Sequence, residues 1–287
     1  MASHAPSSGT PATRWVVIHA DGLAKTLIPA APEMSRTGVD GKTTDVGPLA
    51  YLAGKLLPAL RAALPGATHL VTVLRDGVHP HRVALDPSYG RRPSPPPPRV
   101  VASFPALESF LRSLGGAALE FDEWRAPDLA ATLLARGDAV GMVSKDRTAR
   151  SLVPAGLRLY DPTSRTASPA VDVTYEVAVR EAERLALEGY RPAGVAGVPG
   201  VGAVRAAALL DEHGSLDAVD AAWRDAGHPR AGAAPTARSL LEPMVAGSLP
   251  FPAEMARRDP SDRSRAVAVL TDAGLSSLAG AYARVLR

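Results

Sequence analysis

One glycine-rich stretch, residues 194–216, constrains this chain of 287 residues more than any other part of it. It reads GVAGVPGVGAVRAAALLDEHGSL, and in its first half Gly and Val alternate around a proline. Such a run favours a tight apolar hairpin whose backbone can approach another molecule closely. The second half has helical spacing, with apolar residues at Val204, Ala207 and Leu210, and Gly214 is suited to end that helix. The stretch therefore predicts a hairpin that leads directly into the N-terminus of a helix.

The predicted hairpin has the properties of a phosphate-binding site. A helix N-terminus presents backbone N–H groups that attract anions, and Arg205 adds a positive charge one turn into the helix. The arrangement resembles the helix-hairpin-helix of DNA-binding proteins, so we expect Gly197, Gly200, Gly202 and Arg205 to bind DNA. An ordinary glycine-rich loop in front of an alanine-rich helix is the alternative, because short motifs match by chance.

Composition limits the classes of protein to which the chain can belong. With 46% hydrophobic and 21% charged residues it is typical of a soluble globular protein, and its short apolar runs predict no membrane partner. The segment 1–13 has no apolar core, so we expect a disordered tail and not a signal peptide. The absence of cysteine excludes disulfides and thiolate metal sites and fits a cytoplasmic protein. The net charge of +3 is too small to identify a partner.

Strand and helix patterns alternate through the first 190 residues. The expected strands are 14–20, 68–74, 117–121, 139–143 and 157–160, and the expected helices are 49–64, 104–114, 127–136 and 171–188. Alternation of this kind implies right-handed crossovers and a mainly parallel α/β sheet with helices on both faces. Further helices are expected at 216–226, 236–245 and 266–286.

These elements suggest four regions. They are a tail (1–13), an α/β core (14–170), a helix-hairpin-helix region (171–230) and C-terminal helices that pack on the core (231–287).

Acidic residues follow several of the expected strands. Asp21 and Asp76 each stand before a glycine near a strand end, and Asp146 follows the strand 139–143. The carboxyl ends of parallel strands meet at one edge of a sheet, which is where ligands gather. These acids are therefore candidate metal ligands, although Asp-Gly is also an ordinary turn sequence.

A proline-rich segment, residues 86–99, contains four consecutive prolines, which forbid a helix there and favour an extended loop. Tyr89, Arg91 and Arg92 lie in this segment, and Arg82 precedes it. Cationic and aromatic groups of this kind suit a nucleic acid strand, and a solvated surface loop is an equally good interpretation.

The order of these motifs resembles the 5′-nuclease family, which includes flap endonucleases and the 5′–3′ exonuclease domain of bacterial DNA polymerase I. The order is strand-Asp-Gly twice, Tyr-x-x-Arg-Pro, a helix that opens with acids, Val-Ser-x-Asp and the hairpin, spanning about 15–216. The resemblance implies a Rossmann-like (PIN-like) α/β core and two divalent ions that hydrolyse DNA. It implies that the acids of the first metal site are Asp21, Asp76, Asp128 and Asp146. It also implies that Arg82, Tyr89, Arg91 and Arg92 grip the substrate near its 5′ end.

Five positions depart from the carboxylates of that family. The residues that replace acids are Arg125, Pro127, Thr148, Tyr190 and Ala193. A hard divalent ion needs several oxygen ligands, and the second site keeps only Asp146. Arg125 would repel an ion at the first site and could neutralise its acids instead. We expect a degenerate site that holds at most one weakly bound Mg²⁺ or Mn²⁺, unless Glu123 moves in to restore it.

Three hypotheses follow from these patterns. In the leading one, the chain binds branched or 5′-ended DNA without cleaving it efficiently. In the second, it is an active 5′–3′ exonuclease or flap endonuclease that uses one metal on Asp21, Asp76 and Asp146. In the third, it is a protein-interaction scaffold, but a scaffold has no need of an exposed phosphate site.

Overall fold

The computed structural model describes residues 14–37, 41, 43–90, 97–164, 170–259 and 262–286. Its centre is a six-stranded sheet in the order β5-β4-β1-β6-β7-β8, in which only β7 and β8 pair antiparallel. These strands are β1 (Arg14–His19), β4 (His69–Arg75), β5 (Ala117–Glu120), β6 (Ala139–Val143), β7 (Arg158–Tyr160) and β8 (Ala170–Val171). The predicted mainly parallel α/β sheet is confirmed. A separate two-stranded sheet pairs β2 (Ser35–Thr37) with β3 (Thr43–Asp45).

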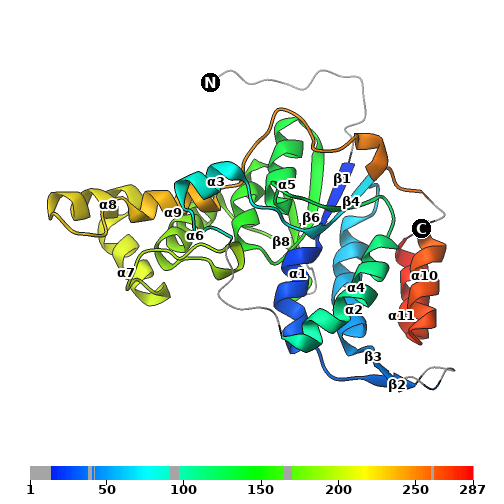
Figure 1. Cartoon of the computed structure of the whole chain (residues 1–287). Coiled ribbons are helices and arrows are strands. Elements are labelled where there is room, and N and C mark those ends of the chain that lie inside the picture. Colours follow the sequence, from blue (N-terminus) through cyan, green and yellow to red (C-terminus); the bar gives the residue numbers. More distant parts are fainter. Residues whose placement is uncertain are drawn as a thin grey trace.

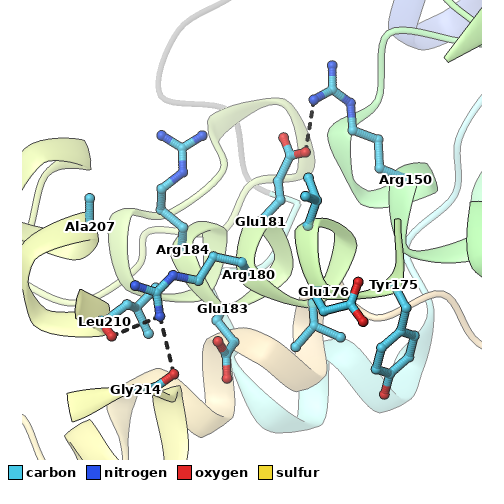
Figure 2. A pocket seen from close by; sticks show the side chains of 12 residues that line it. Arg150, Tyr175, Glu176, Arg180, Glu181, Glu183, Arg184, Ala207, Leu210 and Gly214 are labelled. Atoms are coloured by element: carbon cyan, nitrogen blue, oxygen red, sulfur yellow. Dashed lines mark hydrogen bonds and ion pairs between the residues drawn. The ribbon is translucent and has the colours of Figure 1, made fainter. Parts of the chain in front are cut away.

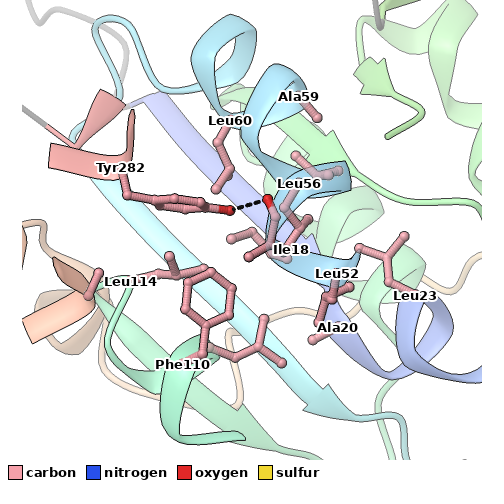
Figure 3. Close-up of a cluster of buried hydrophobic side chains, with 14 of the residues drawn as sticks. Ile18, Ala20, Leu23, Leu52, Leu56, Ala59, Leu60, Phe110, Leu114 and Tyr282 are labelled. Carbon is pink, nitrogen blue, oxygen red and sulfur yellow. Dashed lines mark hydrogen bonds between the residues drawn. The ribbon is translucent and has the colours of Figure 1, made fainter. Parts of the chain in front are cut away.

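One face of the central sheet is covered by five helices (Figure 1). They are α1 (Ala20–Leu27), α2 (Gly47–Ala63), α4 (Pro98–Arg112), α10 (Asp262–Asp272) and α11 (Ser276–Val285), and η1 (Ile28–Ala30) continues α1. Val16 and Ile18 of β1 face this layer. Figure 3 shows Phe110 and Tyr282 in the same cluster, where the hydroxyl of Tyr282 donates to the carbonyl of Ala53 over 2.9 Å. This contact anchors α11 on α2.

The opposite face carries α5 (Ala126–Ala135), η2 (Arg147–Ala155) and the segment 249–256, which ends in η4 (Ala253–Ala256). Trp15 and Val17 of β1 point into this layer, while Val16 and Ile18 point into the other. Alternation with a period of two is what a strand buried on both faces requires. The strand β1 is therefore the centre of both cores.

A second unit, the hairpin lobe, projects from one side of the sheet (Figure 1). It contains α6 (Tyr175–Glu188), η3 (Arg191–Ala193), α7 (Ala203–His213), α8 (Leu216–Asp225) and α9 (Ala233–Leu241), and α3 (Pro80–Leu85) lies against α9. The lobe has its own buried cluster, which includes Leu187, Val198, Leu210, Trp223 and Leu240. In the expected block 231–287, α9 packs on α6, whereas α10 packs on α4 and α11 on α2, so the block is divided between the two units.

Several element boundaries differ from those predicted. The helix expected at 104–114 starts earlier, at Pro98, because the fixed backbone angle of proline suits the first helical position. The helix expected at 266–286 is two helices separated by Gly274, which has a φ of +70°. The helices α1 and α3 were not predicted from the sequence. None of the helices in the described ranges is long and apolar enough to cross a membrane.

Candidate functional site

Acidic side chains converge where β1, β4 and β6 end, because these strands are neighbours in the sheet. The small pocket there, called the strand-end pocket, is lined by His19, Asp21, Gly22, Lys25, Thr26, Asp76, Lys145, Asp146, Tyr190 and Pro192. The convergence predicted for Asp21, Asp76 and Asp146 is therefore observed. One detail differs: β1 ends at His19, and Asp21 lies in the first turn of α1.

His19 is the buried centre of the pocket. Its Nε2 lies 2.8 Å from Oδ2 of Asp76, and its Nδ1 lies 3.0 Å from Oγ of Ser144. Burial by itself lowers the pKa of His19, but the charge and hydrogen bond of Asp76 outweigh burial and raise this pKa to about 9. The pKa of Asp76 is lowered in turn, since His19 and Arg125 outweigh the opposing effect of burial. At neutral pH this is an imidazolium–carboxylate pair.

His19 is a site residue that the sequence patterns did not predict. The available signal was its place at the end of an apolar strand, beside the acid expected there.

Arg125 binds Asp146 inside the protein. Its Nη2 donates to Oδ2 of Asp146 over 2.8 Å and to the hydroxyl oxygen of Thr148 over 3.2 Å. The other carboxylate oxygen of Asp146 accepts from the backbone N–H and the hydroxyl of Thr148. Burial alone lowers the pKa of Arg125, but Asp146 and nearby acids raise it overall, so the guanidinium stays charged. Both oxygens of Asp146 are thus engaged by the protein.

Asp128 has a structural role that the sequence did not reveal. Its two oxygens accept from Nη1 and Nη2 of Arg82, at 2.8 and 2.7 Å, and from the backbone N–H groups of Arg125 and Met244. The carboxylate therefore caps α5 and connects it to α3 and to the chain that follows α9. Asp128 does not line the strand-end pocket, so its assignment as a metal ligand is corrected.

The residues expected to grip DNA near the proline-rich loop need the same correction. Arg82 is 0% exposed because it binds Asp128 and the carbonyl of Glu242. Tyr89 is 4% exposed and packs in the core of the hairpin lobe. Neither side chain is accessible to a DNA strand. Arg91 and Arg92 lie outside the described residues.

The remaining charges of the pocket also form pairs. Asp21 is bound by Lys25, one helical turn away. Each of the three pocket acids thus has a cation of the protein as a partner. Lys145 is half-buried and makes no hydrogen bond or ion pair within the described residues. Glu123 is exposed and does not line the pocket.

These residues do not fit a two-ion centre. Two ions need a ring of uncommitted oxygen ligands, whereas Asp76 and Asp146 are held by His19 and Arg125. Ligand atoms of His19, Asp21 and Asp76 all lie within 4.8 Å of one another, which is close enough to hold a single ion.

The predicted hairpin connects α6 to α7, and Val198 and Val201 anchor it in the lobe core. Gly197, with a φ of +70°, faces Gly189: a Cβ on Gly197 would lie 2.2 Å from the backbone nitrogen of Gly189. Gly197 therefore closes the hairpin and does not present its surface. Gly200 and Gly202 are exposed at the tip.

The N-terminus of α7 is open. No side chain caps it, and no hydrogen bond among the described residues engages the backbone N–H groups of residues 202–205. Val204 is 88% exposed, and the exposed Arg205 has no hydrogen bond or ion pair within the same ranges. Unpaired helix N–H groups beside an unpaired guanidinium form a site suited to phosphate.

Comparison with known proteins finds nucleases and a DNA polymerase among the proteins similar to this chain. No family model matches the chain. It is 32% identical over 197 residues to a 5′–3′ exonuclease of Streptomyces coelicolor, in a match covering 60% of this chain and 64% of that protein. It is 28% identical over 176 residues to the flap endonuclease Xni of Aeromonas salmonicida, with 58% and 66% covered. A match to DNA polymerase I of Rhizobium leguminosarum has 27% identity and covers 61% of this chain and 19% of that protein. The chain thus spans less than two thirds of the length of each of these relatives.

Solved structures show the same fold. The flap endonuclease of bacteriophage T5, in a complex with DNA and metal ions, has a TM-score of 0.53 at 12% identity, covering 95% of this chain and 98% of that chain. The catalytic core of Rad2 with DNA substrate also has a TM-score of 0.53, at 13% identity and 96% and 90% coverage. The fold is therefore an α/β, PIN-like fold of the kind seen in nucleases. The sequence matches to a 5′–3′ exonuclease and a flap endonuclease support a relationship of the chain to the 5′-nuclease family.

Proposed function

We propose that this protein binds branched or 5′-ended DNA as a member of the 5′-nuclease family and that its strand-end pocket does not cleave DNA efficiently. One observation carries the second part: each acid of the pocket is paired with a cation of the protein itself. The pairs are Asp76 with His19, Asp146 with Arg125 and Asp21 with Lys25.

The physical reason lies in charge compensation. Clustered carboxylates repel one another unless cations lie among them, and in a two-metal nuclease site divalent ions supply that charge. Here a guanidinium, which cannot be deprotonated in proteins, lies within hydrogen-bonding distance of Asp146. A metal ion would have to displace it and leave a buried cation without a partner, which costs several kcal/mol.

The hairpin supports the DNA-binding part of the proposal. Its open N–H groups and Arg205 suit the phosphate backbone of a duplex without reading its sequence. Similar structures of the T5 flap endonuclease and of the Rad2 core contain DNA. Lys145 adds a cation at the strand-end pocket.

The test compares binding and cleavage on one labelled 5′-flap duplex. We expect binding in EDTA that weakens steeply with salt, and no cleavage above background with Mg²⁺ or Mn²⁺. Arg205→Glu should abolish binding, while Arg263→Glu, an exposed arginine of α10, should leave it unchanged. Binding that is absent or insensitive to salt would refute the DNA-binding role.

A second candidate function is a single-metal nuclease, which the closeness of His19, Asp21 and Asp76 favours. It requires His19 to lose its proton and Lys25 to release Asp21, because both cations compete with the ion. Metal-dependent cleavage that Asp21→Ala and Asp76→Ala each abolish would establish this function. Cleavage that persists in both variants would come from a contaminating nuclease.

A further inference from the structure

A second arginine lies against the tip of the hairpin, and it comes from a different part of the lobe. Arg230 belongs to the connection between α8 and α9, 30 residues beyond Gly200. A Cβ built on Gly200 would lie 2.9 Å from Nη2 of Arg230 and 3.8 Å from its Cζ. The guanidinium therefore lies against the glycine that forms the exposed tip, three residues before Ala203, the first residue of α7.

The connection that carries Arg230 is held in place by buried groups. The carboxylate of Asp220, which is 1% exposed, accepts from the backbone N–H of Gly232 over 2.6 Å. His228 stacks on Trp223 with ring centroids 5.8 Å apart, and its Nδ1 accepts from the backbone N–H of Arg230 over 3.2 Å. The position of Arg230 beside the hairpin is therefore set by the core of the lobe.

Most other arginines of the lobe are already engaged. Figure 2 shows the groove of about 790 Å³ between α6 and α7, where Arg180 donates to the carbonyls of Leu210 and Gly214. Arg150, on the same groove, binds Glu181. By contrast, Arg230 is half-buried, and its guanidinium has no hydrogen bond or ion pair in the described part of the chain. Its donors remain available to a ligand.

We propose that Arg230 is a second phosphate-binding residue of the hairpin site and that, with Arg205 and the N–H groups of α7, it grips the DNA backbone. The proposal rests on the DNA-binding function proposed above and adds a contact from outside the hairpin itself. A guanidinium presents a planar fork of N–H donors that matches two phosphate oxygens, which a single ammonium cannot do.

The experiment measures the affinity of full-length Arg230→Ala, Arg230→Lys and Arg263→Ala for the 5′-flap duplex across a salt series in EDTA. We expect Arg230→Ala to weaken binding about tenfold and to lower the slope of log affinity against log salt by about one unit. Arg230→Lys should keep the slope, since the charge is kept, and bind less tightly than the parent, since the fork is lost. Arg263→Ala, which removes an exposed arginine of α10, should match the parent in both respects.

The outcomes separate this inference from the function on which it rests. If the parent does not bind the duplex, the proposed function fails. If the parent binds, Arg205→Glu abolishes binding and Arg230→Ala keeps the parent slope and affinity, the function stands and Arg230 has no role in it. If Arg230→Ala binds the duplex more weakly but keeps the salt slope of the parent, Arg230 has only a packing role and the proposal is overturned. The same holds if Arg230→Lys binds no better than Arg230→Ala.

Discussion

The strand-end pocket and the hairpin tip handle charge in opposite ways. In the pocket, Asp21, Asp76 and Asp146 each have a cationic side chain as partner. At the tip, Arg205, Arg230 and the first N–H groups of α7 have no such partner in the described ranges. The difference indicates which site is prepared for a ligand, because an ion adds little binding energy at a site whose charges already balance. Unpaired cations on a surface attract the phosphate groups that approach them.

The largest expected effect concerns Arg125, the cation that pairs with Asp146 of the pocket. Arg125→Ala should lower the free energy of unfolding by about 3–5 kcal/mol, since it leaves Asp146 buried without its charged partner. Millimolar Mn²⁺ should recover part of that loss by supplying the missing positive charge. Chemical denaturation with Mn²⁺ and with EDTA measures both effects.

Arg82→Ala is the matched control for that experiment. It also breaks a buried ion pair, with Asp128, but this carboxylate does not line the pocket. We expect a comparable loss of stability and no response to Mn²⁺. Equal protection of both variants by Mn²⁺ would contradict the view that Arg125 supplies charge at a vestigial metal site.

The next effect is a dependence of stability on pH. The folded pKa of His19, about 9, lies above its unfolded value of about 6.5, so its contribution is complete below pH 6.5 and is lost as the pH rises through 9. The free energy of unfolding should fall by about 3 kcal/mol over this interval. Urea titrations at several pH values test this, with His19→Gln as a variant in which the fall should disappear. A flat profile in the parent would refute the imidazolium–carboxylate pair.

A smaller effect is expected in the hairpin. Gly197→Ala should destabilise the lobe by about 2 kcal/mol, because φ is +70° and the new Cβ would lie 2.2 Å from the backbone nitrogen of Gly189. DNA binding should weaken in parallel as the tip loses its shape. Hydrogen exchange of α6 and α7 localises the change, and an unaltered lobe would contradict the close backbone packing.

The smallest effect has the opposite sign and controls for the glycine substitution. Gly54 lies exposed within α2, where an added Cβ meets no atom within 4 Å. Gly54→Ala should therefore stabilise the protein by about 0.5–1 kcal/mol. Thermal unfolding measures the increase, and DNA binding should not change. A loss of stability here would mean that the helix is constrained by contacts absent from the structure.

The local pattern of the sequence predicted much of the fold. The apolar runs that became β1, β4, β5, β6 and β7 were all identified, because strands buried between two layers are nearly continuous hydrophobic segments. The glycine-rich stretch predicted the hairpin, since positive φ angles at Gly197 and Gly200 exclude most other residues. The short helices α1 and α3 were missed, because a helix of one or two turns has little periodicity.

The roles of individual charged residues were harder to predict from the sequence. Arg82 and Asp128 are 46 positions apart in the chain, and only the tertiary structure, in which α3 packs against α9, shows that they bind each other and not DNA or metal. His19 had no motif, and its charge depends on Asp76, which the parallel pairing of β1 with β4 places beside it. Arg230 reaches the hairpin only because the connection between α8 and α9 lies beside Gly200.

By itself, the sequence determined the α/β sheet and the hairpin, since each depends on residue type and local spacing. Its resemblance to the 5′-nuclease family added the replacement of acids at Arg125, Pro127, Thr148, Tyr190 and Ala193. Tertiary structure alone decided which charges neutralise one another and which remain exposed. The energy of an ion pair depends on distance and burial, and both are set by contacts between residues far apart in the chain.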